Sequence, residues 1–222
     1  MNTELMSLCR SVASRLCQLP SEKLSPFPDG TTLLFPTRRT SKKASDYRAS
    51  EAEARILFCL ELASRGFPFA VEVPTRKTYK FRGATEMSAR TDVVVFSRSG
   101  GRELAVEFKA RPAEDRSITK DIEKLVREGY DGLWFHLLQN VNSRTLRSLF
   151  SKFTSAFTET SEKHPSRRHN LTFVFVVRKK RFWLRKTISP NDNPSLAFDF
   201  EYKLRPGKIE VTNAHGWEYE PL

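Results

Sequence analysis

Two neighbouring stretches of the chain carry acidic and basic residues at a spacing that suits phosphodiester chemistry. Asp92 opens the apolar run DVVVF, and after the turn SRSGGR the run ELAVEFK carries Glu107 and Lys109. Two carboxylates can hold a Mg²⁺ ion, which prefers oxygen ligands and keeps several waters. A nearby lysine can stabilise the negative charge that develops on phosphorus during hydrolysis. These residue types therefore predict a metal-dependent site that cleaves phosphodiester bonds.

The spacing of the three residues predicts that their side chains converge. If SRSGGR closes a symmetric hairpin, Asp92 lies opposite Glu107 across the two strands. Side chains alternate along a strand, so Glu107 and Lys109 share one face. The opposite, core-facing side of the second strand then carries Leu104, Val106 and Phe108.

This arrangement assigns a role to each residue of the set. We expect Asp92 and Glu107 to be the metal ligands, with the main-chain carbonyl of Phe108 as a further oxygen. A bound ion would lower the pKa of an attached water, so water rather than a side chain would attack. Lys109 would position that water or neutralise charge on the phosphorus. A cross-strand salt bridge is the structural alternative, because an acid and a lysine two residues apart are common by chance.

A helix upstream of these strands offers a further carboxylate. Ser50 can cap a helix that ends near Gly66, with Glu53 in the capping-box position three residues after the cap. Glu53 also borders the apolar stripe of this helix, so its carboxylate would lie near whatever the helix covers. We expect Glu53 to support the site; a purely capping role is the alternative, and Glu51 is the alternative acidic residue.

The rest of the chain predicts a mixed sheet flanked by helices. Further helices are expected over residues 2–18, 117–129 and 146–157. Strands are expected over residues 69–73, 78–83, 91–96, 103–109 and 132–138. Two later hairpins are expected over residues 171–188, around RKK, and 198–214, around RPG. The predicted class is α/β, with an N-terminal helix and basic loop over 1–47 and a domain with C-terminal hairpins over 48–222.

Composition points to a polyanionic partner. The chain carries 38 Lys and Arg against 26 Asp and Glu, a formal charge of +12, which favours nucleic acid. An anionic membrane surface is the alternative, but no stretch approaches the roughly 20 apolar residues of a membrane span. The single, unpaired cysteines Cys9, Cys17 and Cys59 fit a reducing compartment. We therefore expect a soluble, cytoplasmic protein.

Several basic segments are candidates for contact with nucleic acid. The segment TRRTSKKASDYR lacks apolar periodicity and is interpreted as a basic loop, either a solvated linker or a phosphate-contacting arm. Its cationic residues are Arg38, Arg39, Lys42 and Lys43. Basic clusters also occur over residues 77–82 and 178–186, the second with Phe182 and Trp183, which would either stack an unpaired base or pack within a hairpin.

The helix expected over 117–129 carries a basic stripe that includes Lys120 and Lys124. This stripe would contact substrate. The alternative is ordinary salt pairing along the helix, because Asp121 and Lys124 are three residues apart, at helical contact spacing.

The histidines and Cys59 have plainer explanations. The four histidines lack the spacing of a zinc site. His136 lies inside an apolar run and is expected to be a core residue, whereas His164 and His169 are expected in a basic surface loop. Cys59 lies in an apolar helical stretch and is expected to be a small core residue.

Taken together, these residues and their setting resemble the PD-(D/E)xK nuclease superfamily. The resemblance covers residues 48–140 and implies a restriction-endonuclease-like core, Mg²⁺ or Mn²⁺, and hydrolysis of DNA or less often RNA. Asp92 and Glu107 match the family's metal ligands, Lys109 its catalytic lysine, and Glu53 its helical glutamate. Thr91 stands where the name-giving motif has proline.

The leading expectation is a magnesium-dependent nuclease that acts on DNA. The alternative is a subunit with the same fold that binds nucleic acid or assembles with a partner without cleavage, since the basic charge exceeds what a small site needs. An interaction protein that binds no nucleic acid is a third class, suggested by the N-terminal helix. A protein partner or a homodimer is compatible with each of these readings.

Overall fold

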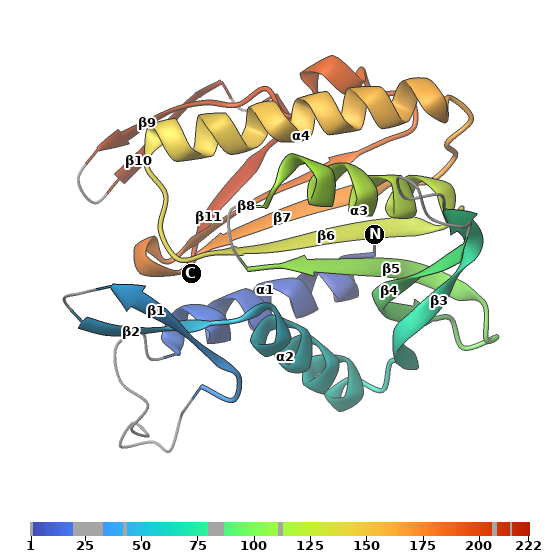
Figure 1. Cartoon of the computed structure of the whole chain (residues 1–222), viewed down its shortest axis with the longest axis horizontal. Helices are drawn as coiled ribbons and strands as arrows, with labels where there is room; N and C mark the ends of the chain where they lie inside the picture. Colours follow the sequence, from blue (N-terminus) through green and yellow to red (C-terminus); the bar gives the residue numbers. More distant parts are fainter. Residues whose placement is uncertain are drawn as a thin grey trace.

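A seven-stranded mixed sheet forms the centre of the protein and is covered by helices on both faces (Figure 1). The computed structural model describes residues 2–19, 33–41, 44–79, 87–110, 113–205, 208–213 and 215–222. The helices are α1 (Thr3–Gln18), α2 (Glu51–Ser64), α3 (Asp115–Arg127) and α4 (Ser143–Lys163), with short 3-10 turns η1 (Arg178–Lys180) and η2 (Pro194–Leu196). The class is α/β, as the sequence predicts.

The central sheet is parallel in its middle and antiparallel toward both edges. Its strands in spatial order are β11 (Glu218–Pro221), β8 (Phe182–Ile188), β7 (Leu171–Val177), β6 (Asp131–Leu138), β5 (Arg102–Lys109), β4 (Met87–Phe96) and β3 (Phe69–Tyr79). Strands β5, β6 and β7 run parallel, and the remaining neighbours pair antiparallel. Helices α3 and α4 provide the crossovers that parallel pairing requires.

The hairpin of β4 and β5 has the predicted register over Val93–Val95, beyond a register shift between Val95 and Phe96 next to the turn. Val93 pairs with Val106, and the ladder continues through Val95 and Leu104 toward the turn. One more step along this register brings Asp92 level with Glu107. The pairing thus places both carboxylates on the same face of the sheet.

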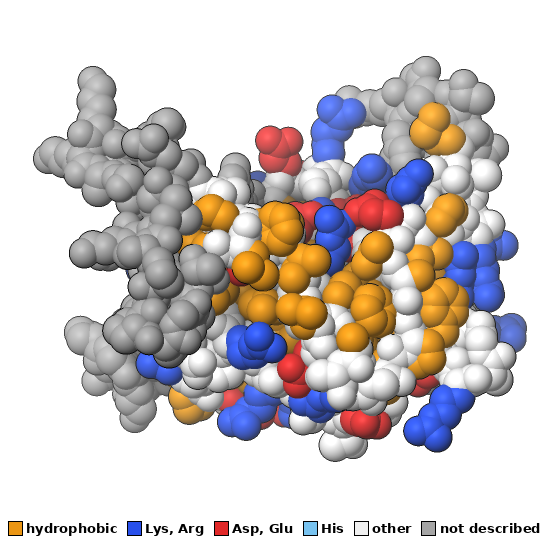
Figure 2. Space-filling view, turned by 90° about the horizontal axis from the view of Figure 1, so that it is seen from below, with side chains coloured by type: hydrophobic (Ala, Val, Ile, Leu, Met, Phe, Trp, Pro, Cys, Tyr) orange, Lys and Arg blue, Asp and Glu red, His pale blue; other side chains and the backbone are white. Residues whose placement is uncertain are grey.

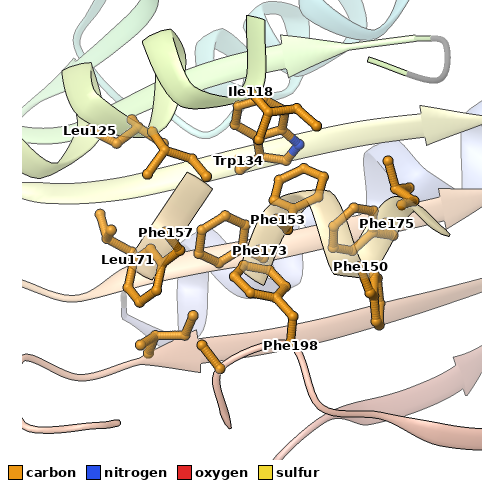
Figure 3. Close-up of a cluster of buried hydrophobic side chains, with 14 of the residues drawn as sticks. Ile118, Leu125, Trp134, Phe150, Phe153, Phe157, Leu171, Phe173, Phe175 and Phe198 are labelled. Carbon is orange, nitrogen blue, oxygen red and sulfur yellow. The ribbon is translucent and has the colours of Figure 1, made fainter. Parts of the chain in front are cut away.

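An aromatic core fills the space between the sheet and the α3–α4 layer (Figure 3). Phe153 of α4 meets Trp134 of β6 edge to face, with ring centroids 5.0 Å apart. Phe173 and Phe198 make a similar contact at 4.8 Å. Such pairs contribute about 0.5–1.5 kcal/mol each beyond their buried area. This packing holds α3 and α4 against β6 and β7.

The opposite face of the sheet is covered by α1 and α2 (Figure 1). Phe58 of α2 contacts Phe108 of β5, with ring centroids 5.4 Å apart. The guanidinium of Arg178 is buried and donates hydrogen bonds of 2.7 Å to the carbonyls of Leu16 and Leu19 at the end of α1. Helix α1 is therefore fixed to the domain by its apolar side and by its C-terminus.

Helix α3 approaches the sheet most closely at Gly132 of β6. A Cβ atom at this position would lie 2.6 Å from Cδ2 of Leu171 and 3.2 Å from Cβ of Leu125 on α3. Real Cβ atoms do not come so close to neighbours, so only glycine fits without displacement. The absence of a side chain sets the distance between α3 and β6.

The basic segment expected to be a loop is instead a short hairpin, and this corrects the sequence prediction. Its strands are β1 (Pro36–Ser41) and β2 (Ala44–Ala49), which pair with each other alone. Neither strand pairs with the central sheet, and the hairpin sequence does not alternate apolar and polar residues, so its pattern carries no strand signal. Lys42 and Lys43 lie outside the described residues.

Other boundaries also differ. The expected strands 69–73 and 78–83 are joined in β3 as far as Tyr79, and residues 80–83 lie outside the described part. The expected hairpin around RPG is confirmed as β9 (Glu201–Arg205) and β10 (Lys208–Asn213), which form a separate two-stranded sheet. Strand β11, which the sequence did not predict, completes one edge of the central sheet.

Candidate active site

The β4–β5 hairpin brings Asp92 to the segment that carries Glu107 and Lys109. Oδ2 of Asp92 accepts a hydrogen bond of 2.8 Å from the main-chain N–H of Phe108. The side chain of Phe108 packs in the core with α2, so the alternating side chains of Glu107 and Lys109 face α3. Two of the predicted ligands and the predicted lysine therefore lie together on one face.

Helix α3 meets this face with a buried chain of ion pairs. Nζ of Lys124 lies 2.7 Å from Oε1 of Glu107 and 2.9 Å from Oδ1 of Asp121. The second oxygen of Asp121, Oδ2, lies 2.8 Å from Nζ of Lys109. Charges from β5 and α3 thus alternate in one network that joins Glu107 to Lys109.

Glu107 of this network and Asp92 beside it lie in an environment that disfavours their charge. Asp121 differs: burial would raise its pKa, but Lys124 and Lys109 outweigh this effect and the pKa is lowered. Burial raises the pKa of Glu107 well above its usual range, Lys124 opposes this, and the nearby negative charges of Asp121 and Asp92 add to it. Burial also raises the pKa of Asp92, against the hydrogen bond from the N–H of Phe108. Clustered acids with raised pKa values are typical of functional sites, because they repel one another unless a cation is present.

The two helical glutamates separate into different surroundings. Glu53 is 1% exposed, and its carboxylate accepts hydrogen bonds from the main-chain N–H groups of Phe35 at 2.7 Å and Leu34 at 3.2 Å. Its own N–H donates to the Ser50 side chain, which confirms Ser50 as the cap. The carboxylate of Glu53 thus fastens residues 34–35 to α2 and is directed to them, not to the Asp92 segment.

Glu51, two residues before Glu53 at the start of α2, lies on the side of Lys109. Burial raises the pKa of Glu51, the ammonium of Lys109 lowers it, and Asp92 raises it further. Glu51 also lines a cavity of about 380 Å³ together with Lys109. Of the two acids weighed from the sequence, the structure brings Glu51 to the cluster.

This cavity forms where the first turns of α2 and α3 meet the end of β5. Its lining residues are Thr37, Ser50, Glu51, Ala52, Lys109, Ala110, Ala113 and Ser117. Main-chain N–H groups at the start of a helix favour anionic groups. The cavity therefore lies beside the starts of two helices, with one ammonium and one carboxylate among its lining side chains.

The described residues that were predicted to contact nucleic acid lie on two separate elements, β1 and α3. Lys124 is only 5% exposed and pairs with Asp121, as the salt-pairing alternative predicts, whereas Lys120 is exposed. Arg38 and Arg39 belong to β1, where their main chains pair with those of Tyr47 and Asp46. Lys124 thus contributes to the buried network and does not form part of an exposed stripe.

Four further predictions concern the aromatic pair of β8, two histidines and one cysteine. Phe182 and Trp183 are each 1% exposed, which confirms that they pack within the hairpin and leaves neither ring accessible to a base. His136 is fully buried and Cys59 is buried, as expected. The prediction for His169 was wrong: its ring is buried and its Nε2 lies 2.8 Å from the carbonyl of Leu125, because the loop folds back onto α3.

The face that carries α1 and α2 has an apolar centre. Figure 2 shows hydrophobic side chains gathered in the middle of this face, with Lys and Arg side chains scattered among and around them. Leu60 of α2, for example, is 51% exposed.

Among the described residues, no helix combines the length and apolar character needed to cross a bilayer.

Binding of a divalent cation depends on which side chains of the site can act as its ligands. Within the described ranges, no group of three or more His, Cys, Asp or Glu side chains is arranged to hold a metal ion. Two carboxylates, Asp92 and Glu107, still offer the hard oxygen donors that Mg²⁺ prefers when water completes its shell. Glu51 and Asp121 lie nearby, and the cations beside these four acids include Lys109, Lys124 and Arg55, whose Nη1 lies 3.9 Å from Oδ1 of Asp92. The residues therefore fit a divalent cation by donor type.

Similarity to known proteins does not add to this picture. No protein-family model matches the chain, and no curated protein matches it significantly.

Proposed function

We propose that the protein is a metal-dependent nuclease that hydrolyses phosphodiester bonds in DNA, with a restriction-endonuclease-like core. The observation that carries this proposal is the hydrogen bond from the N–H of Phe108 to Asp92, because it joins the first acid to the Glu107–Lys109 segment. The cavity next to Lys109 provides space for a sugar-phosphate group. The formal charge of +12 favours a polyanionic substrate.

Asp92, Glu107 and the carbonyl of Phe108 would hold Mg²⁺ or Mn²⁺. When bound, such an ion polarises a phosphate oxygen and lowers the pKa of an attached water. Asp92 is kept in place for this role by the Phe108 N–H, which occupies Oδ2. Glu51 faces the same cavity and would orient water through its carboxylate, the part that the sequence assigned to Glu53.

Lys109 would act through its positive charge. Burial alone would lower its pKa, but the carboxylate of Asp121 outweighs this effect and the pKa is raised. The ammonium therefore stays protonated at neutral pH and is suited to stabilise negative charge on phosphorus, not to remove a proton. Asp121 holds Nζ of Lys109 at 2.8 Å and so fixes where that charge is presented.

The test compares cleavage by the wild type, Lys109→Met and Asp92→Asn. Labelled single- and double-stranded DNA and RNA are incubated with Mg²⁺, with Mn²⁺, or with chelator. We expect metal-dependent cleavage by the wild type and a loss of about 100-fold or more in each variant. Lys163→Met, at the exposed end of α4, is the matched control and should cleave like the wild type. Equal product from all four proteins would exclude the proposed site.

A subunit that binds nucleic acid without cleaving it is the second candidate. It is favoured by Lys124, whose ammonium already neutralises Glu107 at 2.7 Å. In the same assay this candidate predicts retention on DNA at low salt and no product under any metal condition. An interaction protein that binds no nucleic acid predicts that retention is absent as well.

A further inference from the structure

Lys124 occupies a position that resembles a cation site made of oxygen atoms. Its Nζ lies 2.7 Å from Oε1 of Glu107, 2.9 Å from Oδ1 of Asp121 and 3.0 Å from the carbonyl oxygen of Arg90. These three oxygens come from β5, α3 and β4, and the side chain is almost fully buried. The buried positive charge of Lys124 therefore neutralises part of the negative charge of Glu107 and Asp121.

The ammonium of Lys124 and a divalent ion would share one ligand. Glu107 pairs with Lys124 and is also, under the proposed function, a ligand of the metal. Two cations at one carboxylate repel each other strongly in a buried site, where the effective dielectric constant is low. Binding of a divalent ion at Glu107 and retention of the Lys124 contact therefore oppose each other.

We propose that Lys124 is an internal competitor for the divalent cation at Asp92 and Glu107. Without metal, Lys124 neutralises Glu107 and keeps the site folded. When a divalent ion binds, Lys124 releases Glu107 and keeps its contacts with Asp121 and the carbonyl of Arg90. The protein consequently binds the ion more weakly than its carboxylates alone would allow. This inference rests on the proposed metal site.

The first experiment measures the dissociation constant for Mn²⁺ by electron paramagnetic resonance of the free ion. Lys124→Met should bind Mn²⁺ about tenfold more tightly or better than the wild type, because one positive charge is removed beside the ligand. Lys124→Arg keeps the charge and should bind like the wild type. Lys109→Met removes a charge paired with Asp121, and should give a smaller gain. Unchanged or weaker binding by Lys124→Met would overturn the proposal.

A second measurement does not depend on the folding of Lys124→Met. The buried Nζ of Lys124 is followed by ¹⁵N NMR of the wild type during a Mg²⁺ titration and is assigned by its absence in Lys124→Arg. We expect its signal to move as Mg²⁺ saturates the site. A signal that stays unchanged at saturating Mg²⁺ would contradict the competition.

Failure of this inference can be separated from failure of the nuclease proposal. Tighter Mn²⁺ binding by Lys124→Met, without cleavage by any variant, retains the competitor and removes the nuclease. Metal-dependent cleavage, with the same Mn²⁺ affinity in the wild type and Lys124→Met, retains the nuclease and removes the competitor. Absence of Mn²⁺ binding by the wild type and by Lys124→Met overturns both.

Discussion

Glu107 and Lys124 form a buried pair in which the two partners do not contribute equally to stability. Burial and the neighbouring acids Asp92 and Asp121 disfavour the charge of Glu107, whereas Lys124 is surrounded by oxygen atoms. Removing one partner of a buried pair is costly when it leaves the other uncompensated. Removal of Lys124 leaves Glu107 without its ion-pair partner, although Asp121 keeps Lys109, whereas removal of Glu107 leaves Lys124 paired with Asp121.

The resulting prediction concerns stability without metal. Lys124→Met should lower the free energy of unfolding by about 3 kcal/mol. Glu107→Gln should leave this free energy unchanged or raise it, since it removes a charge that the site disfavours. Urea unfolding in the presence of a chelator measures both. A larger loss in Glu107→Gln than in Lys124→Met would contradict the assigned charge balance.

His169 should make the stability depend on pH. Burial lowers its pKa, partly opposed by the hydrogen bond with the Leu125 carbonyl. The unfolded state therefore binds a proton more readily than the folded state. The stability that neutral His169 contributes is fully present above its unfolded pKa of about 6.5 and is lost as pH falls from there through the lower folded pKa.

Urea unfolding of the wild type and His169→Gln at pH values on both sides of this window checks the prediction. The wild type should lose more free energy of unfolding than the variant on acidification. His164→Gln, in the partly exposed end of the same loop, is the control and should keep the wild-type response. The same slope in all three proteins would exclude His169 as a cause.

At the residue scale, the sequence predicted those contacts that a single hairpin creates. Asp92, Glu107 and Lys109 converge because β4 and β5 are joined by a short turn, and their register beyond the shift at Phe96 is the expected one. The link from Glu107 to Lys124 joins a strand to a helix of another layer, and no local spacing reveals it. The direction of the Glu53 carboxylate likewise depends on residues 34–35, which are far away in the chain.

Among the elements, α1 depends on a distant arginine. Arg178 donates to the carbonyls of Leu16 and Leu19, at the end of α1, which lack partners within the helix. Arg178→Met keeps the apolar stem but removes both of these hydrogen bonds, together with the one from Nη1 to Oε1 of Gln139 at 3.0 Å. We expect a loss of about 2–3 kcal/mol in the free energy of unfolding, in the range of hydrogen bonds to charged groups.

Hydrogen exchange should locate this loss. Amides of α1 should exchange faster in Arg178→Met, whereas those of β6 and β7 should change least. Lys179→Met alters the exposed neighbour on the same turn and serves as the control. Uniform acceleration across the whole chain would show that Arg178 stabilises the domain and not α1 in particular.

Most helices and central strands were predictable because one face of each is buried. The apolar spacing of α4 and the continuous apolar runs of β6 and β7 follow directly from their positions in the core. The β1–β2 hairpin lacks such a pattern, since its strands pair only with each other. Strand β11 is four residues long and ends at Pro221, so its sequence carries little strand signal.

At the scale of the whole molecule, the positive charge should govern binding of nucleic acid. The logarithm of the association constant for DNA should fall linearly with the logarithm of salt concentration, with a slope of about −0.9 for each phosphate contacted. Replacing Arg38, Arg39, Lys42 and Lys43 together by alanine should make this slope shallower. Arg144→Ala with Arg147→Ala, on the exposed side of α4, is the comparison. Equal slopes in the two multiple variants would assign no special role to the hairpin.

The fold class followed from the order of elements, but the site depends on how three layers meet. Glu51 comes from the α1–α2 layer, Lys109 from the sheet, and Asp121 from the α3–α4 layer. Each layer was predictable by its own periodicity. Their relative placement depends on side-chain packing between layers, which a single sequence does not reveal.

Gly132 of β6 influences where α3 lies relative to the sheet, and so influences the site from a distance. A methyl group there would lie 2.6 Å from Cδ2 of Leu171 and 3.2 Å from Cβ of Leu125, so both the Leu171 side chain and α3 would have to move, although Gly132 carries no charge. Asp121 and Lys124 lie on α3, so an outward shift of this helix would lengthen their contacts with Lys109 and Glu107 together. The smallest residue of β6 thereby acts as the spacer that keeps two pairs of opposite charges within reach of each other.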